Sequence, residues 1–205
     1  MKKSLKIFIA LAAMASLSFM PHNEPRKIKI VLDAGHGGND YGAKHEQFTE
    51  KEITAQIIGK IKAANKNENV DIQITRVSDE SISLIDRAAL INRIKPDLVL
   101  SLHVNYNENN KASGFEIFTS KTDNANNEKS VVFAKRLSNK LSANIGITNR
   151  GIKEAPFVLL NKSEAPAVVV ELGFLSNPND RVLLTGDSGQ DQIAKTILEF
   201  ISEME

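Results

Sequence analysis

The sequence predicts a single α/β domain in which helices cover both faces of a largely parallel central sheet. Short apolar runs of strand length alternate along the chain with segments of helical periodicity. The chain has 205 residues, of which 41% are hydrophobic, so it has room for one well-packed core. Strands that alternate with helices in this way favour parallel pairing through crossover helices.

Apolar runs that stop at polar or glycine-rich segments mark the expected strands. Residues 28–33 form the first, and residues 70–75 alternate strictly, as in a half-buried strand. Residues 97–102 and 167–171 are apolar enough to be buried on both faces. Residues 114–118 form a further short segment of this kind.

Apolar residues at helical spacing mark the expected helices. A helix is expected at residues 50–65, a second after residue 83, a third at residues 130–141 and a last one at the C-terminus. Residues 157–160 form a short apolar segment. The spaced apolar positions are Ile53, Ile57 and Ile61, then Leu84, Ala88 and Ile91, and finally Ile193, Ile197, Phe200 and Ile201.

The first 20 residues have the features of a secretory signal peptide, with Lys2, Lys3 and Lys6 preceding 14 uncharged residues. This stretch is short for a membrane span of about 20 residues, although an uncleaved anchor is the alternative. We therefore expect an exported protein, periplasmic rather than extracellular, with a domain at residues 27–205 and no stable membrane anchor. Loss of the three lysines lowers the net charge from +1 by three, to −2.

Composition excludes several function classes. The chain has no cysteine, which removes disulfides, thiolate zinc sites, cysteine nucleophiles and a cysteine lipid anchor. Its 26 Lys and Arg residues are spread along the chain and balanced by 25 Asp and Glu, so no nucleic-acid partner is expected. Any metal must be held by carboxylates and the four histidines.

Polar residues near the carboxyl ends of the strands are the first candidates for a site, because ligands of open α/β sheets bind there. His36 follows the first strand, His103 and Glu171 close two buried strands, and Glu50 opens a helix. Two histidines and a carboxylate are a ligand set of hydrolytic zinc sites. The spacings of 14, 53 and 68 residues require ligands from different elements.

These residues belong to a series of motifs that the chain carries in order. They are Asp33-Ala-Gly-His36-Gly-Gly-Asn-Asp40-Tyr-Gly42-Ala43, Glu50-Lys51, Thr75-Arg76, Leu84-Ile-Asp-Arg87, Ser101-Leu-His103-Val-Asn105, Gly114-Phe-Glu116, Arg150-Gly-Ile-Lys153 and Pro166-Ala-Val-Val-Val-Glu171-Leu-Gly-Phe174-Leu-Ser-Asn177. In this order they resemble the catalytic domain of zinc-dependent N-acetylmuramoyl-L-alanine amidases, from about residue 28 to the C-terminus.

The resemblance implies one zinc ion per chain, bound by His36, Glu50 and His103, with Glu171 as the catalytic carboxylate. It implies hydrolysis of the amide between the lactyl group of N-acetylmuramic acid and L-alanine, with peptidoglycan as the partner. The implied roles are wall remodelling, turnover or daughter-cell separation. Asn105 is a candidate substrate-binding residue, because it lies two positions beyond His103 in an extended chain.

Several residues have a structural alternative. Glu50 suits the first turn of a helix that Thr49 caps, and His103 suits a buried hydrogen-bonded position. Glu171 is open to pairing with Arg87 or Arg150. Asp40 is a candidate brace for the metal loop, Gly37 and Gly38 are expected to allow close backbone approach to it, and Arg76 and Arg87 suit either substrate carboxylates or structural ion pairs.

Two other functions compete with the amidase. One is a zinc peptidase that acts on stem peptides, and the other is a wall-binding protein that has lost its chemistry. The second predicts a missing ligand or base, whereas all four residues are present. About 50 residues separate Phe118 from Glu171, room for one helix and one strand. We therefore expect no blocking helix over the metal, no separate wall-binding module and no requirement for an activator protein.

Overall fold

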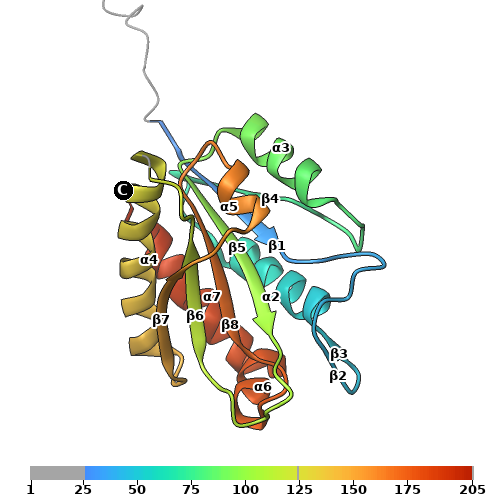
Figure 1. Cartoon of the computed structure of the whole chain (residues 1–205). Helices are drawn as coiled ribbons and strands as arrows, with labels where there is room; N and C mark the ends of the chain where they lie inside the picture. Colours follow the sequence, from blue (N-terminus) through green and yellow to red (C-terminus); the bar gives the residue numbers. More distant parts are fainter. Residues whose placement is uncertain (1–25, 124, 205) are drawn as a thin grey trace, which may run out of the picture.

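A six-stranded sheet forms the centre of the protein, in the order β4-β1-β5-β8-β6-β7 (Figure 1). The structure is a computed structural model that describes residues 26–123 and 125–204, so the expected leader lies outside the described residues. The strands are β1 (Ile28–Ala34), β4 (Val70–Ile74), β5 (Leu98–Asn105), β6 (Phe115–Thr119), β7 (Asn149–Glu154) and β8 (Ala167–Phe174). Only β6 and β8 pair antiparallel among these neighbours, which confirms the predicted fold class.

Helices cover both faces of this sheet, as predicted (Figure 1). The larger core lies under α2, α4 and α7, and a smaller one lies under α3 and α5. Among the described residues, no helix has the length and apolarity needed to cross a membrane. The helices are α2 (Glu50–Ala64), α3 (Leu84–Ile94), α4 (Ala125–Asn144), α5 (Val158–Lys162), α6 (Pro178–Thr185) and α7 (Asp187–Ser202).

The two-residue repeat of the central strands decides which face each side chain occupies. Successive side chains of a strand point to opposite faces. Val99 and Val169 pack in the smaller core, under α3 and α5. Residues two or four positions further along the same strands share that face, which places His103 of β5 and Glu171 of β8 there. Asp33 of β1 shares this face as well, because it follows Val31 by two residues.

Two buried strands are longer than their apolar runs. β5 continues to Asn105 and β8 to Phe174, whereas the sequence predicted ends at residues 102 and 171. His103 and Glu171 therefore lie inside strands, opposite each other in register, and not in the loops that follow. Past the apolar runs the two strands pair with each other, since His103 pairs with Glu171 and Asn105 with Phe174.

Several elements have no counterpart in the sequence prediction. The hairpin of β2 (Lys44–His45) and β3 (Phe48–Thr49) and the strand β7 are short and largely polar. The helix α6 begins after Asn177, whose side chain accepts hydrogen bonds from Asn179 N and Asp180 N. This Asn-Pro start was a readable signal. Residues 157–160 form the N-cap and first turn of α5, so the segment before β8 holds two helices.

The packing of β8 generates a test of core stability. Val170 is 0% exposed in the larger core, and Val182 on α6 is 73% exposed. We expect Val170→Ala to lower the free energy of unfolding by about 2–3 kcal/mol, because it deletes two buried methyl groups and leaves a cavity. The matched control Val182→Ala should change it by less than about 0.5 kcal/mol. Urea unfolding measures both, and equal losses would contradict this account of the core.

Candidate metal centre

The loop after β1 presents His36 in a left-handed backbone conformation, with φ of 63°. Three cationic side chains hold this loop against the domain. Arg87 Nη2 donates to His36 O at 2.9 Å, Arg76 Nε donates to Ala34 O at 3.3 Å, and Lys51 Nζ donates to Gly38 O at 2.8 Å. The position of the His36 imidazole is therefore set by α2 and α3 as well as by β1.

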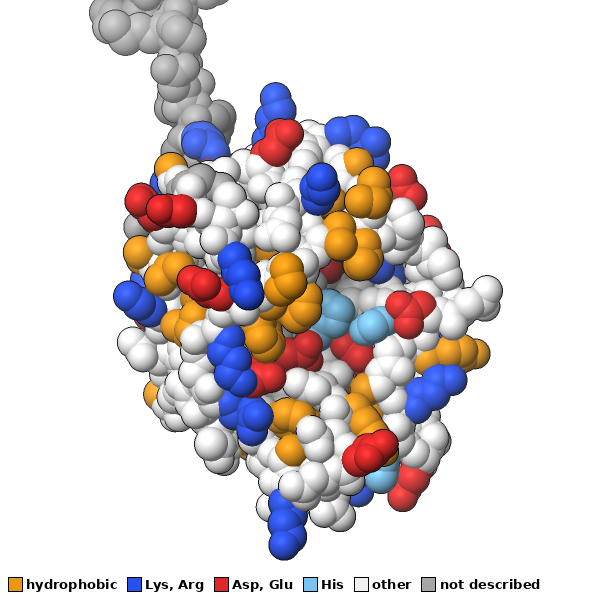
Figure 2. Space-filling view, viewed as in Figure 1, with side chains coloured by type: hydrophobic (Ala, Val, Ile, Leu, Met, Phe, Trp, Pro, Cys, Tyr) orange, Lys and Arg blue, Asp and Glu red, His pale blue; other side chains and the backbone are white. Residues whose placement is uncertain are grey.

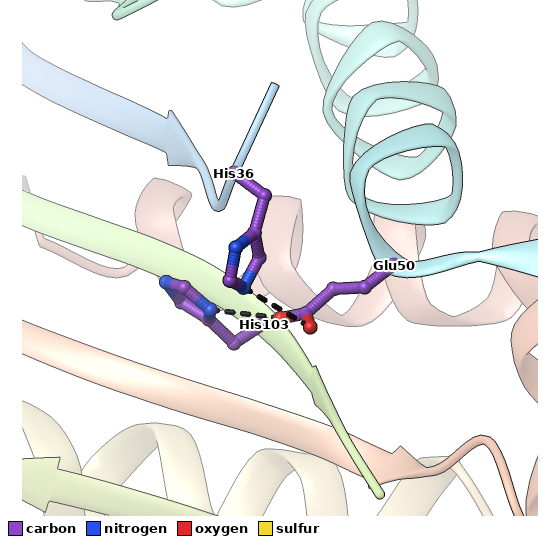
Figure 3. Close-up of side chains that lie close together, drawn as sticks. All are labelled: His36, Glu50 and His103. Atoms are coloured by element: carbon purple, nitrogen blue, oxygen red, sulfur yellow. Dashed lines mark hydrogen bonds and ion pairs between the residues drawn. The ribbon is translucent and has the colours of Figure 1, made fainter. Parts of the chain in front are cut away.

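His36, Glu50 and His103 converge from a loop, a helix and a strand (Figure 3). Glu50 Oε2 lies 3.1 Å from His36 Nε2, and Glu50 Oε1 lies 2.8 Å from His103 Nδ1. Each residue offers one ligand atom, and these atoms all lie within 4.8 Å of one another. A metal ion would fit such a set, since two imidazole nitrogens and one carboxylate oxygen leave a coordination position open.

Glu50 is oriented by more than its place in the helix. It is 4% exposed, and its oxygens also accept hydrogen bonds from Ala43 N at 2.8 Å and Val104 N at 3.0 Å. Thr49 occupies the N-cap position without a side-chain cap bond, and its hydroxyl donates to Glu52 instead. Although burial opposes ionisation, hydrogen bonds to the two histidines hold the pKa of Glu50 well below its ordinary range.

Asp40 braces His36, as the sequence predicted. Its Oδ2 lies 2.8 Å from His36 Nδ1, so Nε2 is the nitrogen that faces Glu50. A carboxylate on the second ring nitrogen is typical of metal-binding histidines, because it orients the ring. Burial lowers the pKa of His36, but Glu50 and Asp40 outweigh it and raise this pKa to about 9.

Two sets of glycines permit close approaches around the cluster. A Cβ at Gly42 would lie 2.3 Å from Glu50 Oε2, and one at Gly35 would lie 2.5 Å from the His103 ring. By contrast, a Cβ at Gly37 or Gly38 would meet the loop at residues 80–81. Gly35 and Gly42 therefore permit the close approach within the cluster, and the prediction that Gly37 and Gly38 allow backbone to approach the metal loop closely is confirmed by the contacts with Glu80 and Ser81.

A cavity of about 780 Å³ opens on the face of α3 and α5, and both histidines line it. Figure 2 shows the histidines at the base of a hollow, with acidic and apolar side chains around them. Glu171 lines the same cavity, and Leu84 and Phe157 form part of the opposite, apolar wall. His36, His103 and Glu171 therefore face one space that is open to a substrate, and Glu50 lies behind the two histidines, outside the lining.

Glu171 contributes a carboxylate without a cation. Among the described residues, its Oε2 is buried and has no hydrogen-bond partner. Burial raises the pKa of Glu171 to about 7. The two expected alternative partners are engaged elsewhere, since Arg87 Nη1 lies 2.6 Å from Asp33 and Arg150 Nε lies 3.0 Å from Glu116. The structural alternative, in which Glu171 pairs with one of these arginines, is therefore not the one that the contacts support.

Arg87 and Arg76 have structural partners. Arg87 forms a buried ion pair with Asp33, whose second oxygen accepts from Ser101 Oγ at 2.6 Å. Arg76 Nη2 donates to Lys51 O at 2.7 Å. Of the two alternatives open for these arginines, structural pairing is the one that the contacts support.

Asn105 lies beside the cluster and outside the lining of the cavity. Its Nδ2 donates to Glu116 Oε1 at 3.1 Å, and its Oδ1 accepts from Tyr106 N. Its role in substrate binding stays a prediction. Sequence reasoning assigned no role to Glu116, although the Gly114-Phe-Glu116 motif was a signal.

An α/β domain that gathers two histidines and a carboxylate in a cavity is typical of metal-dependent hydrolases. The model of the N-acetylmuramoyl-L-alanine amidase family matches residues 30–203, and the chain belongs to this family.

Named relatives agree with the family. The N-acetylmuramoyl-L-alanine amidase LytC of Bacillus subtilis is 32% identical over 82% of the chain, which spans only 34% of LytC. Two other curated relatives are 34% and 35% identical, and the chain spans 59% and 65% of their lengths.

Solved structures share the fold. The crystal structure of an N-acetylmuramoyl-L-alanine amidase from Clostridium difficile 630 matches with a TM-score of 0.81 and 30% identity, over 87% of this chain and 96% of that one. The CwlD amidase from Clostridioides difficile, solved in complex with the GerS lipoprotein, matches with a TM-score of 0.79 and 28% identity, over 86% and 98% of the two chains.

The contact at Gly42 generates a test of metal binding. We expect Gly42→Ala to weaken zinc binding by about 10- to 100-fold, because a methyl group there displaces Glu50 and His36. Competition with a chromophoric chelator measures the affinity. The matched control is Gly59→Ala on α2, where a Cβ would meet nothing within 4 Å. Equal affinities for the two variants would show that Gly42 does not shape the site.

The burial of Glu171 generates a test of pH-dependent stability in the presence of a chelator. The folded-state pKa of about 7 exceeds the ordinary 4.5, so the folded protein retains a proton that the unfolded chain releases between these values. Wild-type stability should therefore fall between pH 4.5 and 7, by up to about 3 kcal/mol, relative to Glu171→Gln.

Urea unfolding at pH 4.5 and pH 8 measures this difference. The exposed Glu68 supplies the control Glu68→Gln. Stability curves of the wild type and Glu171→Gln that stay parallel across this window would contradict the assigned pKa.

Proposed function

We propose that this chain is a zinc-dependent N-acetylmuramoyl-L-alanine amidase that hydrolyses the amide between the lactyl group of N-acetylmuramic acid and L-alanine in peptidoglycan. The observation that carries the proposal is the shared cavity, where two of the three clustered candidate ligands, His36 and His103, lie with Glu171, whose buried Oε2 has no hydrogen-bond partner among the described residues. Family membership supplies the substrate class.

In this proposal His36, Glu50 and His103 hold one zinc ion. Bound zinc polarises the amide carbonyl and lowers the pKa of water. Two imidazoles and one carboxylate suit zinc, and the chain has no cysteine that would favour a softer ligand set. Asp40 keeps the His36 ring in the orientation that directs Nε2 to the metal.

Glu171 is proposed as the general base and then the general acid. Its carboxylate takes a proton from the attacking water as the new C–O bond forms. It returns that proton to the nitrogen of L-alanine as the C–N bond breaks. A pKa of about 7 suits both steps at neutral pH, because a group whose pKa lies near the working pH gains and loses a proton readily.

We further propose that the protein is exported to the periplasm under the direction of residues 1–20 and acts in wall remodelling, turnover or daughter-cell separation. Activity without an activator is part of the proposal. Between β6 and β8, α4 packs on the opposite face of the sheet, and α5 contributes one wall of the cavity. The alternative is that a partner protein is required for activity, since the similar CwlD amidase was solved in complex with a lipoprotein.

Digestion of purified peptidoglycan by the purified chain tests the reaction. New L-alanine amino termini should appear without any added protein, disappear with a chelator and return with zinc. Glu171→Gln should retain zinc and lose about 10²- to 10⁴-fold in turnover, because it cannot carry the proton. Amino-terminal analysis and metal analysis measure the two outcomes.

Other products identify the alternatives. New termini only inside the stem peptide would indicate a peptidase, and zinc binding without any product would indicate a wall-binding protein. Activity that needs an added partner would overturn the activator-free proposal. The control Glu68→Gln changes an exposed carboxylate outside the cavity and should digest as the wild type does.

A further inference from the structure

A second polar cluster lies directly beside Glu171 and has no role in the proposed reaction. Glu116 of β6 stands opposite Glu171 of β8 in the antiparallel register, and directly opposed residues share a face of the sheet. Lys153 of β7 pairs with Phe118, two residues after Glu116, so it belongs to that face too. The cluster therefore extends the cavity face across the sheet toward its β7 edge.

The cluster has two cationic side chains, Lys153 and Arg150, for one carboxylate, Glu116. Glu116 is 5% exposed and accepts hydrogen bonds from Lys153 Nζ at 2.5 Å, Arg150 Nε at 3.0 Å and Asn105 Nδ2 at 3.1 Å. One of the two cations balances the carboxylate. The Lys153 and Arg150 side chains are 44% and 34% exposed, so the surplus charge faces solvent. In Figure 2, Lys and Arg side chains gather beside the acidic side chains next to the histidines, where Figure 1 places β6 and β7.

The other side of the cavity has the opposite character. Leu84 and Phe157 line its wall and are 56% and 39% exposed. Among the described residues that line the cavity, Arg87 is the only lysine or arginine, and its side chain is buried in an ion pair with Asp33. The cavity is thus apolar toward α3 and α5, and the cationic cluster lies beyond Glu171 on the same face of the sheet, outside the cavity lining.

We infer that Lys153, with Arg150, forms a subsite for a carboxylate of the stem peptide. This inference rests on the proposed function. The glycan of the substrate consists of neutral N-acetylated sugars apart from the linkage being cut, whereas the stem peptide carries free carboxylates. Charge complementarity then orients the substrate, with the peptide crossing β8 and β6 toward β7 and the sugars facing the apolar wall.

The distances agree with this direction. Neighbouring strands are about 4.8 Å apart, so β7 lies about 10 Å from β8 along the sheet. An extended peptide advances about 3.5 Å per residue, which brings a carboxylate on the second or third residue after the scissile amide within reach of Lys153. Glu116 holds the ammonium group on the β6 side of β7, nearer to Glu171.

Substrates that differ only in charge test the subsite. Three synthetic muramoyl-tripeptides are compared: one with all carboxylates free, one with a carboxamide on the second residue and one with a carboxamide on the third. The wild type should lose about three- to tenfold in kcat/KM on one of the two amidated substrates. The substrate that is penalised identifies which carboxylate is bound.

Variants of Lys153 separate recognition from folding. In Lys153→Gln the ratio of kcat/KM for the free substrate to that for the amidated substrate should fall toward one, while Lys153→Arg should keep the wild-type ratio. Glu116 retains Arg150 and Asn105 as partners in both variants, and thermal melts check that the fold persists. Lys195→Gln is the matched control, because this lysine is 79% exposed on α7, on the opposite face of the sheet.

The same substrates are titrated calorimetrically into zinc-loaded Glu171→Gln, so that recognition is measured without turnover. The subsite would be overturned if the free and amidated peptides bound with the same Kd. It would also be overturned if the difference between their Kd values persisted in the Lys153→Gln background. Failure of the proposed function has a different signature: amidation would still weaken binding, but the wild type would hydrolyse none of the substrates.

Discussion

The buried ion pair between Asp33 and Arg87 is the contact on which the loop that carries the candidate ligand His36 depends. Arg87 reaches from α3 to the end of β1, where it binds the Asp33 carboxylate at 2.6 Å and donates to the carbonyl oxygens of Ala34 and His36. One guanidinium thus joins a helix, a strand and the loop that carries a candidate ligand. Removing one partner of a buried pair leaves an uncompensated charge, so this arrangement is strongly held once it forms.

Two glutamates of the site show how environment assigns different chemistry to one residue type. Glu50 accepts hydrogen bonds from two histidines and two backbone amides, and these donors keep it ionised as a ligand. Glu171 is buried beside it, and among the described residues its Oε2 has no donor, so burial raises its pKa to about 7. Two carboxyl pKa values separated in this way suit the two roles proposed above, with Glu50 as a ligand and Glu171 as a proton carrier.

Much of this site was predictable because its residues follow recognisable signals. Apolar runs located the strands that carry His103 and Glu171, and the motif around His36 located the loop. The ends of β5 and β8 were placed too early, since pairing of these two strands with each other extends them beyond their apolar residues. The roles of Gly35 and Gly42 and the partners of Arg87 and Arg150 depend on distances between segments far apart in sequence, which no local pattern encodes.

The sequence by itself determined the fold class, the family and the identity of the four residues proposed for the reaction. Periodicity and motif order carry that information, because each strand, helix and loop imposes its own local pattern. Only the tertiary structure decided that Glu171 Oε2 has no partner among the residues that the structure describes, and that Glu116 pairs with Arg150 and Lys153. The physical reason is that strand order and register, set by packing of the whole domain, determine which charged side chains become neighbours.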